Sequence, residues 1–313
     1  MVEVIKRLNP DLLSSRSRLL WQGDAQDFLT TLPVAPLFDL VVTSPPYNIN
    51  KEYEEKIPLD EYLVWQKKII VEIAKRTKIT GSICWQVGNF VENGHIIPLD
   101  VEIHPIFREL GFKLRNRIIW HFGHSLHSKR RFSGRYEVVL WYTKGGEYTF
   151  NLDDVRVPSK YPGKRHFKGP NKGKISGHPA GKNPEDVWNI PNVKSNHVEK
   201  TEHPCQFPVG LVERLILALT NKSDLVFDPF CGVGSAGVAA TIHERRFWGC
   251  EISKKYTKIA QKRINDAEIG HAKYRPHDQP IYDHTQSKLS LMPIDTKSSD
   301  KTNESILNKM DIC

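Results

Sequence analysis

Short apolar runs alternate with amphipathic segments along most of the chain. Residues 38–42 form an apolar run that stops at two prolines, which indicates a buried strand with an abrupt end. Residues 59–75 carry apolar side chains at helical spacing and predict a helix. By the same criteria we expect strands at residues 18–21, 81–87, 115–122, 136–142, 224–227 and 246–250, and helices just after residue 24 and at 105–110, 209–219 and 235–240. Helices alternating with short buried strands predict an α/β protein with a Rossmann-like, doubly wound and mostly parallel sheet.

The periodicity disappears between residue 151 and about residue 202. Glycine and proline become frequent there, basic residues outnumber acidic ones, and residues 160–170 interleave basic with aromatic side chains. The segment is too long for an ordinary connection, so it is either functional or disordered. Trp188 favours a packed end. We therefore interpret 151–202 as a small irregular module inserted in or appended to one large α/β core, and residues 268–313 as a polar tail.

Composition narrows the class of protein. The chain has 313 residues and a formal net charge of +9, which favours a polyanionic partner such as nucleic acid but also fits many ordinary soluble proteins. The first ten residues lack the apolar stretch of a signal peptide, and no apolar run approaches the ~18–20 residues needed to span a bilayer. Five scattered cysteines favour a reducing, cytoplasmic environment, and His203 with Cys205 lacks the spacing of a metal site. We expect neither a membrane location nor a metal.

The first candidate site directly follows the strand at 38–42. Ser44, Pro45, Pro46 and Tyr47 form a loop stiffened by its two prolines, at the carboxyl end of that strand. The loop presents a hydroxyl group, free carbonyls and an aromatic ring. These groups suit a planar ligand with an amino group, although an isolated loop of this kind is often only a turn.

The second candidate site lies about 180 residues later. The strand at 224–227 leads into Asp228, Phe230, Gly232 and Gly234, and a helix of small residues follows. Glycines at such a turn allow close approach of a ligand, and the helix N-terminus offers free N–H groups. Glu251, at the end of the next strand, is placed to hold a ribose. Asp24, after the strand at 18–21, could hold a ligand or merely cap the next helix.

Three signatures together resemble those of the amino-group DNA methyltransferases. They are Ser44-Pro45-Pro46-Tyr47, the 228–234 motif, and His203-Pro204-Cys205-Gln206-Phe207-Pro208. Their order resembles the circularly permuted β group, which implies a catalytic half at 1–150, a target recognition region at 151–202 and a cofactor half at 203–267. The resemblance implies S-adenosyl-L-methionine as cofactor, double-stranded DNA as substrate, and a bacterial or archaeal restriction-modification system whose endonuclease is a genetic rather than a binding partner. It assigns catalysis to residues 44–47 and cofactor binding to Asp24, His203, Asp228, Phe230, Gly232, Gly234 and Glu251.

The resemblance also implies a chemistry for the first loop. The Ser44 side chain and the Pro45 carbonyl would accept hydrogens from an exocyclic amino group, aiming the nitrogen lone pair at the sulfonium methyl, and Tyr47 would stack on a flipped base. Serine before the two prolines is associated with cytosine N4, whereas Asn48-Ile49 after Tyr47 resembles adenine-modifying members. We favour adenine N6 slightly, with cytosine N4 as the alternative.

More distant alternatives belong to other methyltransferase classes. Pro204-Cys205-Gln206 resembles the nucleophile loop of cytosine-C5 methyltransferases, but it precedes the glycine motif here and leaves the first loop unexplained. RNA and protein methyltransferases with a related loop normally have the unpermuted motif order.

Two basic segments are candidates for DNA contact. Lys129, Arg130 and Arg131 lie in a loop between two predicted strands, and Lys164 and Arg165 lie in the insert. We expect all five to contact phosphates. For the first loop, a merely solvated basic loop is an equal alternative.

Overall fold

The computed structural model describes residues 1–6, 17–49, 54–123, 127–283 and 285. Its main feature is a nine-stranded sheet in the order β1-β2-β11-β10-β3-β4-β8-β7-β9. The strands are β1 (Glu3–Ile5), β2 (Arg18–Gln22), β3 (Phe38–Thr43), β4 (Thr77–Val87), β7 (Lys113–His121), β8 (Tyr136–Thr143), β9 (Val187–Asn189), β10 (Leu225–Asp228) and β11 (Arg246–Glu251). From β1 to β4 every neighbouring pair is parallel, and β8 is antiparallel to both β4 and β7. The predicted α/β fold is confirmed.

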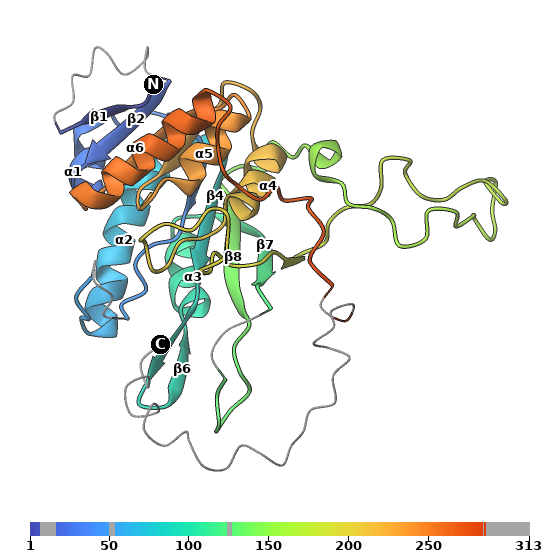
Figure 1. Ribbon diagram of the computed structural model, residues 1–313, viewed down its shortest axis with the longest axis horizontal. Coiled ribbons are helices and arrows are strands. Elements are labelled where there is room, and N and C mark those ends of the chain that lie inside the picture. The colour runs from blue at the N-terminus through green and yellow to red at the C-terminus, as the bar shows by residue number, and fades with distance from the viewer. Residues whose placement is uncertain (7–16, 50–53, 124–126, 284, 286–313) are drawn as a thin grey trace.

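Helices cover both faces of this sheet (Figure 1). One face packs against α1 (Ala25–Thr31), α2 (Leu59–Arg76) and α3 (Leu99–Glu109), and the other against α4 (Val209–Leu219), α5 (Ser235–Ile242) and α6 (Lys254–Glu268). The alternation along β3 explains the two layers, because Val41 joins the first core whereas Leu40 and Val42 join the second. A strand buried on both faces reads as a continuous apolar run, as residues 38–42 do.

The connections reverse direction between β10 and β3. From β3 the chain crosses through α2 to β4, whereas from β10 it crosses through α5 to β11 on the opposite side. Ligands of open α/β sheets bind beyond the carboxyl ends of the strands at such a switch point. The two candidate loops, after Thr43 and after Asp228, begin at this place.

Several elements differ from the sequence prediction. The helix expected at 105–110 begins at Leu99 and contains Pro105 internally. The short strands β1 and β9 and the hairpin of β5 (Asn89–Glu92) and β6 (His95–Pro98) were not predicted. Helix α6 was missed although Ser253 caps it, accepting from the Tyr256 amide. No described helix is long and apolar enough for a membrane span.

The beginning of the polar tail is anchored rather than loose. The Arg275 amide donates to Glu199 Oε1 (3.1 Å) and the His277 amide to Glu213 Oε2 (2.7 Å). Gly210 permits this close approach, since a Cβ there would lie 2.7 Å from the Arg275 carbonyl oxygen. The part of the predicted polar tail that contacts α4 is therefore held by hydrogen bonds. The stretch 286–313 lies outside the described residues.

Candidate active site

A cavity of about 540 Å³ lies beyond the carboxyl ends of β3 and β10. Its lining brings together nine of the residues predicted from the sequence, namely Asp24, Ser44, Pro45, Pro46, Tyr47, His203, Phe230, Gly232 and Glu251. The two candidate loops, far apart in the sequence, thus form opposite walls of one site. Of the predicted catalytic and cofactor residues, Asp228 and Gly234 do not line the cavity.

Hydrogen bonds from α2 and from residues 54–57, which lie between the loop and α2, fix the first loop. The Tyr62 hydroxyl donates to the Pro46 carbonyl (2.8 Å). Asn48 adopts a positive φ of 63° and is buried, and its side chain bonds both the N–H and the C=O of Ile57 (2.8 and 2.6 Å). Glu54 accepts from the amides of Asn48 and Ile49 (2.8 and 3.0 Å). The rigidity expected from the two prolines is therefore extended by side chains that sequence reasoning did not identify.

A chain of hydrogen bonds runs from this loop to strand β8. The Ser44 hydroxyl donates to Tyr47 Oη (3.1 Å), and the Tyr47 hydroxyl donates to Glu137 Oε2 (3.2 Å). The Gln86 side-chain amide donates to the same Glu137 oxygen. Burial raises the pKa of Glu137, and burial together with the Glu137 charge raises the pKa of Tyr47 well above its usual value. Sequence reasoning missed Glu137, whose only signal is an acidic residue in a run of apolar strand residues.

Asp228 lies behind the cavity wall and joins the two halves of the site. It is completely buried, and its Oδ1 atom accepts from Thr43 Oγ1 (2.6 Å) and from the Phe230 amide (3.1 Å). Its Oδ2 atom has no hydrogen-bond partner among the described residues. Burial raises the pKa of this carboxyl to about 7. Asp228 therefore braces β10 against β3 and keeps one acceptor atom unused.

The two glycines of the second loop have different surroundings. Gly232 has a φ of 49° and lines the cavity, and a Cβ there would lie 3.3 Å from His203 Nε2. Gly234 has a φ of 79°, and a Cβ there would lie 3.0 Å from the Ala260 Cβ of α6. The geometry therefore does not indicate direct contact between Gly234 and a ligand. Gly234 allows the turn and the close packing of α6.

Asp24 and Glu251 lie at neighbouring strand ends on the cavity wall. Asp24 caps α1 by accepting from the amides of Gln26 (2.7 Å) and Asp27 (3.3 Å). The capping alternative is correct, and it does not exclude ligand contact because Asp24 also faces the cavity. Glu251 accepts from the Ser253 amide (2.7 Å), and burial raises its pKa.

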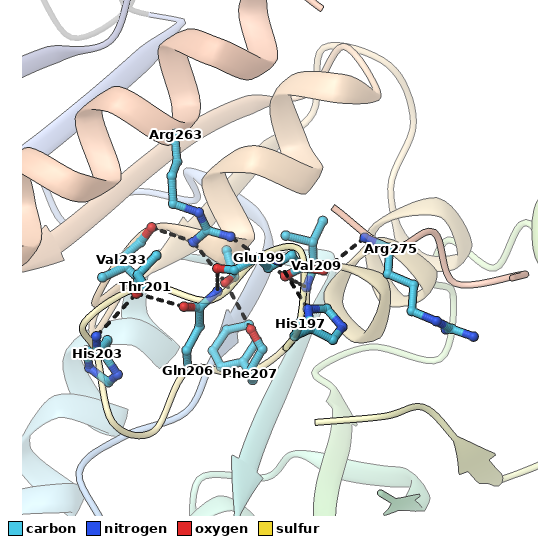
Figure 2. Close-up of polar contacts among 11 residues, drawn as sticks. His197, Glu199, Thr201, His203, Gln206, Phe207, Val209, Val233, Arg263 and Arg275 are labelled. Atoms are coloured by element: carbon cyan, nitrogen blue, oxygen red, sulfur yellow. Dashed lines mark hydrogen bonds and ion pairs between the residues drawn. The ribbon is translucent and has the colours of Figure 1, made fainter. Parts of the chain in front are cut away.

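A buried polar network holds the segment that carries His203 (Figure 2). The Glu199 carboxylate accepts from the Val209 amide (2.9 Å) and lies 3.7 Å from the Arg263 guanidinium. Arg263 also donates to the Val233 carbonyl (2.7 Å) in the glycine loop. Both loops on this side of the cavity are therefore tied to one ion pair, which sequence reasoning also missed.

The segment itself folds back through its own side chains. Thr201 Oγ1 donates to Gln206 Oε1 (2.8 Å), and the Cys205 amide donates to His203 Nδ1 (3.2 Å). The His203 ring packs 4.6 Å from the ring of Tyr256. This places His203 against Gly232 at the cavity wall.

The basic segments lie outside the cavity. Lys129, Arg130 and Arg131 are exposed in the loop between β7 and β8, whose flanking residues Phe122 and Glu137 line the cavity. Lys164 and Arg165 are exposed in an irregular projection, which extends away from the sheet (Figure 1). Two antiparallel bridges, Val157–Lys182 and Arg165–Ile175, hold the projection together. The Arg165 guanidinium is partly engaged with the Gly173 carbonyl (2.6 Å).

The fold and this cavity define an α/β protein with a ligand site at the switch point of its sheet. The chain matches the DNA methylase family model of N6 and N4 methyltransferases over residues 38–262. It is 49% identical to the type II methyltransferase M.BglII of Bacillus subtilis over 242 residues, covering 77% of this chain and 67% of the relative. It is 32% identical to the DNA adenine methyltransferase YhdJ of Escherichia coli K12 over 263 residues, covering 82% and 86% of the two chains. The chain therefore belongs to the family of DNA amino-methyltransferases.

Solved structures agree with the fold. The cytosine-N4-specific PvuII DNA methyltransferase superposes with a TM-score of 0.62 at 21% identity, covering 82% of this chain and 93% of that one. A DNA modification methylase from Thermus thermophilus, complexed with S-adenosyl-L-methionine, gives a TM-score of 0.56 at 26% identity, covering 80% and 96%.

Proposed function

We propose that this chain is a site-specific DNA methyltransferase that moves the methyl group of S-adenosyl-L-methionine to an exocyclic amino group of a base flipped out of duplex DNA. The observation that carries the proposal is the shared cavity, which joins the 44–47 loop and the glycine loop in one space. Its volume of about 540 Å³ lies within the ordinary range for small-ligand sites.

The glycine side of the cavity fits the cofactor. The positive φ of Gly232 leaves an open approach that a Cβ would narrow. Glu251 and Asp24 supply carboxylates at adjacent strand ends, suited to the ribose and the adenine. Asp228 acts through the loop that it braces, while His203 and Phe230 enclose the methionine end. The cofactor supplies an activated methyl group on a sulfonium, so these residues have only to bind and orient it.

The opposite side of the cavity fits the acceptor base. Ser44 and the Pro45 carbonyl accept the amino hydrogens, which turns the nitrogen lone pair toward the methyl group. Tyr47 provides an aromatic face beside them. A base inside a duplex cannot reach this cavity, so the target has to be flipped out. Positioning supplies most of the acceleration, and the reaction proceeds without a metal.

We assign adenine N6 as the target. The supporting relative is YhdJ, which is named an adenine methyltransferase. Ser44 is the observation that favours the alternative, cytosine N4. Both amino groups offer two hydrogens to the same acceptors, so the loop geometry fits either base.

Residues 151–202 form the target recognition region in this proposal, between a catalytic half at 1–150 and a cofactor half at 203–267. Between Val155 and Pro184 the insert carries basic but no acidic side chains, and its projection offers Lys164 and Arg165 to phosphates. Lys129, Arg130 and Arg131 reach the duplex beside the cavity. The biological role is protection of cytoplasmic host DNA from an endonuclease encoded with this gene.

The test is methylation of mixed-sequence duplex DNA with radiolabelled S-adenosyl-L-methionine, followed by mass spectrometry of the nucleosides. We expect N6-methyladenine in duplex DNA and no transfer to RNA or protein. Detection of N4-methylcytosine would change the assigned target from adenine N6 to cytosine N4. Detection of 5-methylcytosine or of labelled RNA would overturn the proposed reaction. Sequencing of the methylated positions then gives the recognition site.

A further inference from the structure

The hydrogen-bond chain between the 44–47 loop and β8 has a fixed direction. An ionised carboxylate can only accept hydrogen bonds. Tyr47 must therefore donate its single hydroxyl hydrogen to Glu137 (3.2 Å), and its oxygen is left to accept from Ser44 (3.1 Å). The Ser44 hydrogen is thereby committed away from the cavity, and the remaining lone pairs of Ser44 are free to accept.

This direction matters because a serine hydroxyl is otherwise ambiguous. It can donate or accept, and its hydrogen rotates to suit the neighbour. A hydroxyl that donated to the amino nitrogen of the target base would occupy the lone pair that has to attack the methyl group. The chain to Glu137 removes this possibility.

We propose that Glu137 is a positioning residue that fixes the direction of the Ser44–Tyr47 hydrogen bonds and so makes Ser44 an obligate acceptor for the target amino group. The inference rests on the proposed function and deepens it by adding a residue from β8. Gln86 holds the carboxylate from β4, since its amide donates to the same oxygen. Trp120 of β7 lies opposite Glu137 in the sheet and also lines the cavity.

The direction depends on the charge of Glu137. When Glu137 is protonated it can donate to Tyr47, which allows the whole chain to reverse. Burial raises the pKa of Glu137 above its usual value, so turnover should fall at the acid side as this carboxyl takes up a proton. Other titratable groups also line this cavity, namely Asp24, Tyr47, Glu54, Glu55, Tyr62, His203, Cys205, Cys231, Cys250, Glu251 and Tyr256. An acid limb caused by any other group of the cavity would survive substitution of Glu137.

The experiment compares Glu137→Gln with Tyr47→Phe, the double variant, and Glu147→Gln as the control. Gln keeps the shape of Glu137 but can donate as well as accept, and Phe removes the hydroxyl that transmits the direction. Glu147 is exposed beyond the other end of β8. Cofactor affinity by calorimetry, kcat and KM for DNA, and the pH profile of kcat are measured for each.

We expect Glu137→Gln to lower kcat by about 10- to 100-fold, as misplacement of a reacting group does, with cofactor affinity within about twofold of the original. The acid limb of kcat should disappear, and Glu137→Gln should add little in the Tyr47→Phe background, because both act through one chain. Glu147→Gln should match the unsubstituted protein.

An unchanged kcat and acid limb in Glu137→Gln would overturn the inference, as would additive effects in the double variant. A loss of cofactor affinity equal to the loss of kcat would also overturn it, since that marks a general structural role. Failure of the unsubstituted protein to methylate any DNA would instead overturn the proposed function.

Discussion

Replacing Glu199 by Ala tests how the walls of the cofactor side are held. Glu199 is buried, and its carboxylate joins the N-terminus of α4, the 275–277 segment and Arg263. Removing one partner of a buried ion pair costs about 3–5 kcal/mol, because the other charge is left without compensation. The buried amide of Val209 and the partly buried amide of Arg275 also lose their acceptor.

The effect should be visible in a thermal melt. A loss of about 3–5 kcal/mol corresponds to a decrease in Tm of roughly 6–20 °C for a domain of this size. Cofactor affinity should fall as well, because Arg263, the partner of the Glu199 carboxylate, also holds the Val233 carbonyl in the glycine loop. Glu202→Ala is the matched control, since Glu202 pairs only at the surface with Lys255 and surface pairs contribute ~0–1 kcal/mol. If Glu199→Ala melts within about 1 °C of the control, the anchoring argument is wrong.

Three further outcomes are expected. Tyr47→Ala should keep cofactor affinity in calorimetry but lose most methyl transfer at low DNA concentration, since stacking on a base contributes about 1–3 kcal/mol; normal turnover would remove Tyr47 from the site. Asp228 has its pKa raised to about 7, so the stability that its protonated form contributes is present below about pH 4 and is lost as pH rises through about 7. Asp228→Asn removes this pH dependence. Without cofactor, the Tm of the variant minus the Tm of the original protein should therefore increase from pH 5 to pH 8. Parallel Tm profiles would contradict the assignment. Lys164→Ala should weaken binding to all duplex sequences alike and lower the salt slope by about one unit, whereas an effect confined to one sequence would place Lys164 on a base edge.

The sequence was sufficient for the centre of the fold. Residues 40–42 and 225–227 are apolar because both faces of their strands are buried, and this pattern does not depend on distant partners. Edge elements were harder to predict. β1 and β9 are three residues long each, and such short strands exist through pairing with a neighbour rather than through a pattern of their own.

The residues of the candidate site also divide into those that could be predicted from the sequence and those that could not. Loops with special backbone chemistry, such as 44–47 and Gly232, were recognisable because proline and glycine carry their geometry with them. Glu137 and Glu199 were not, since the role of such an acid is identified only by the residues that surround it in three dimensions. Gly234 was singled out for the approach of a ligand, and the sequence did not indicate that α6 packs against it.

The hydrogen bond between Thr43 and Asp228 joins residues that are 185 positions apart in the chain. A ribosome adds roughly 5–20 residues per second, so the 44–47 loop emerges about 10–40 s before Tyr256, the last described residue along the chain that lines the cavity. During that interval Ser44 and Tyr47 exist without the opposite wall of the cavity. The nascent chain therefore has no complete cavity until synthesis has passed residues 151–202 and β11, and we expect a chain truncated before that point to transfer no methyl group to DNA.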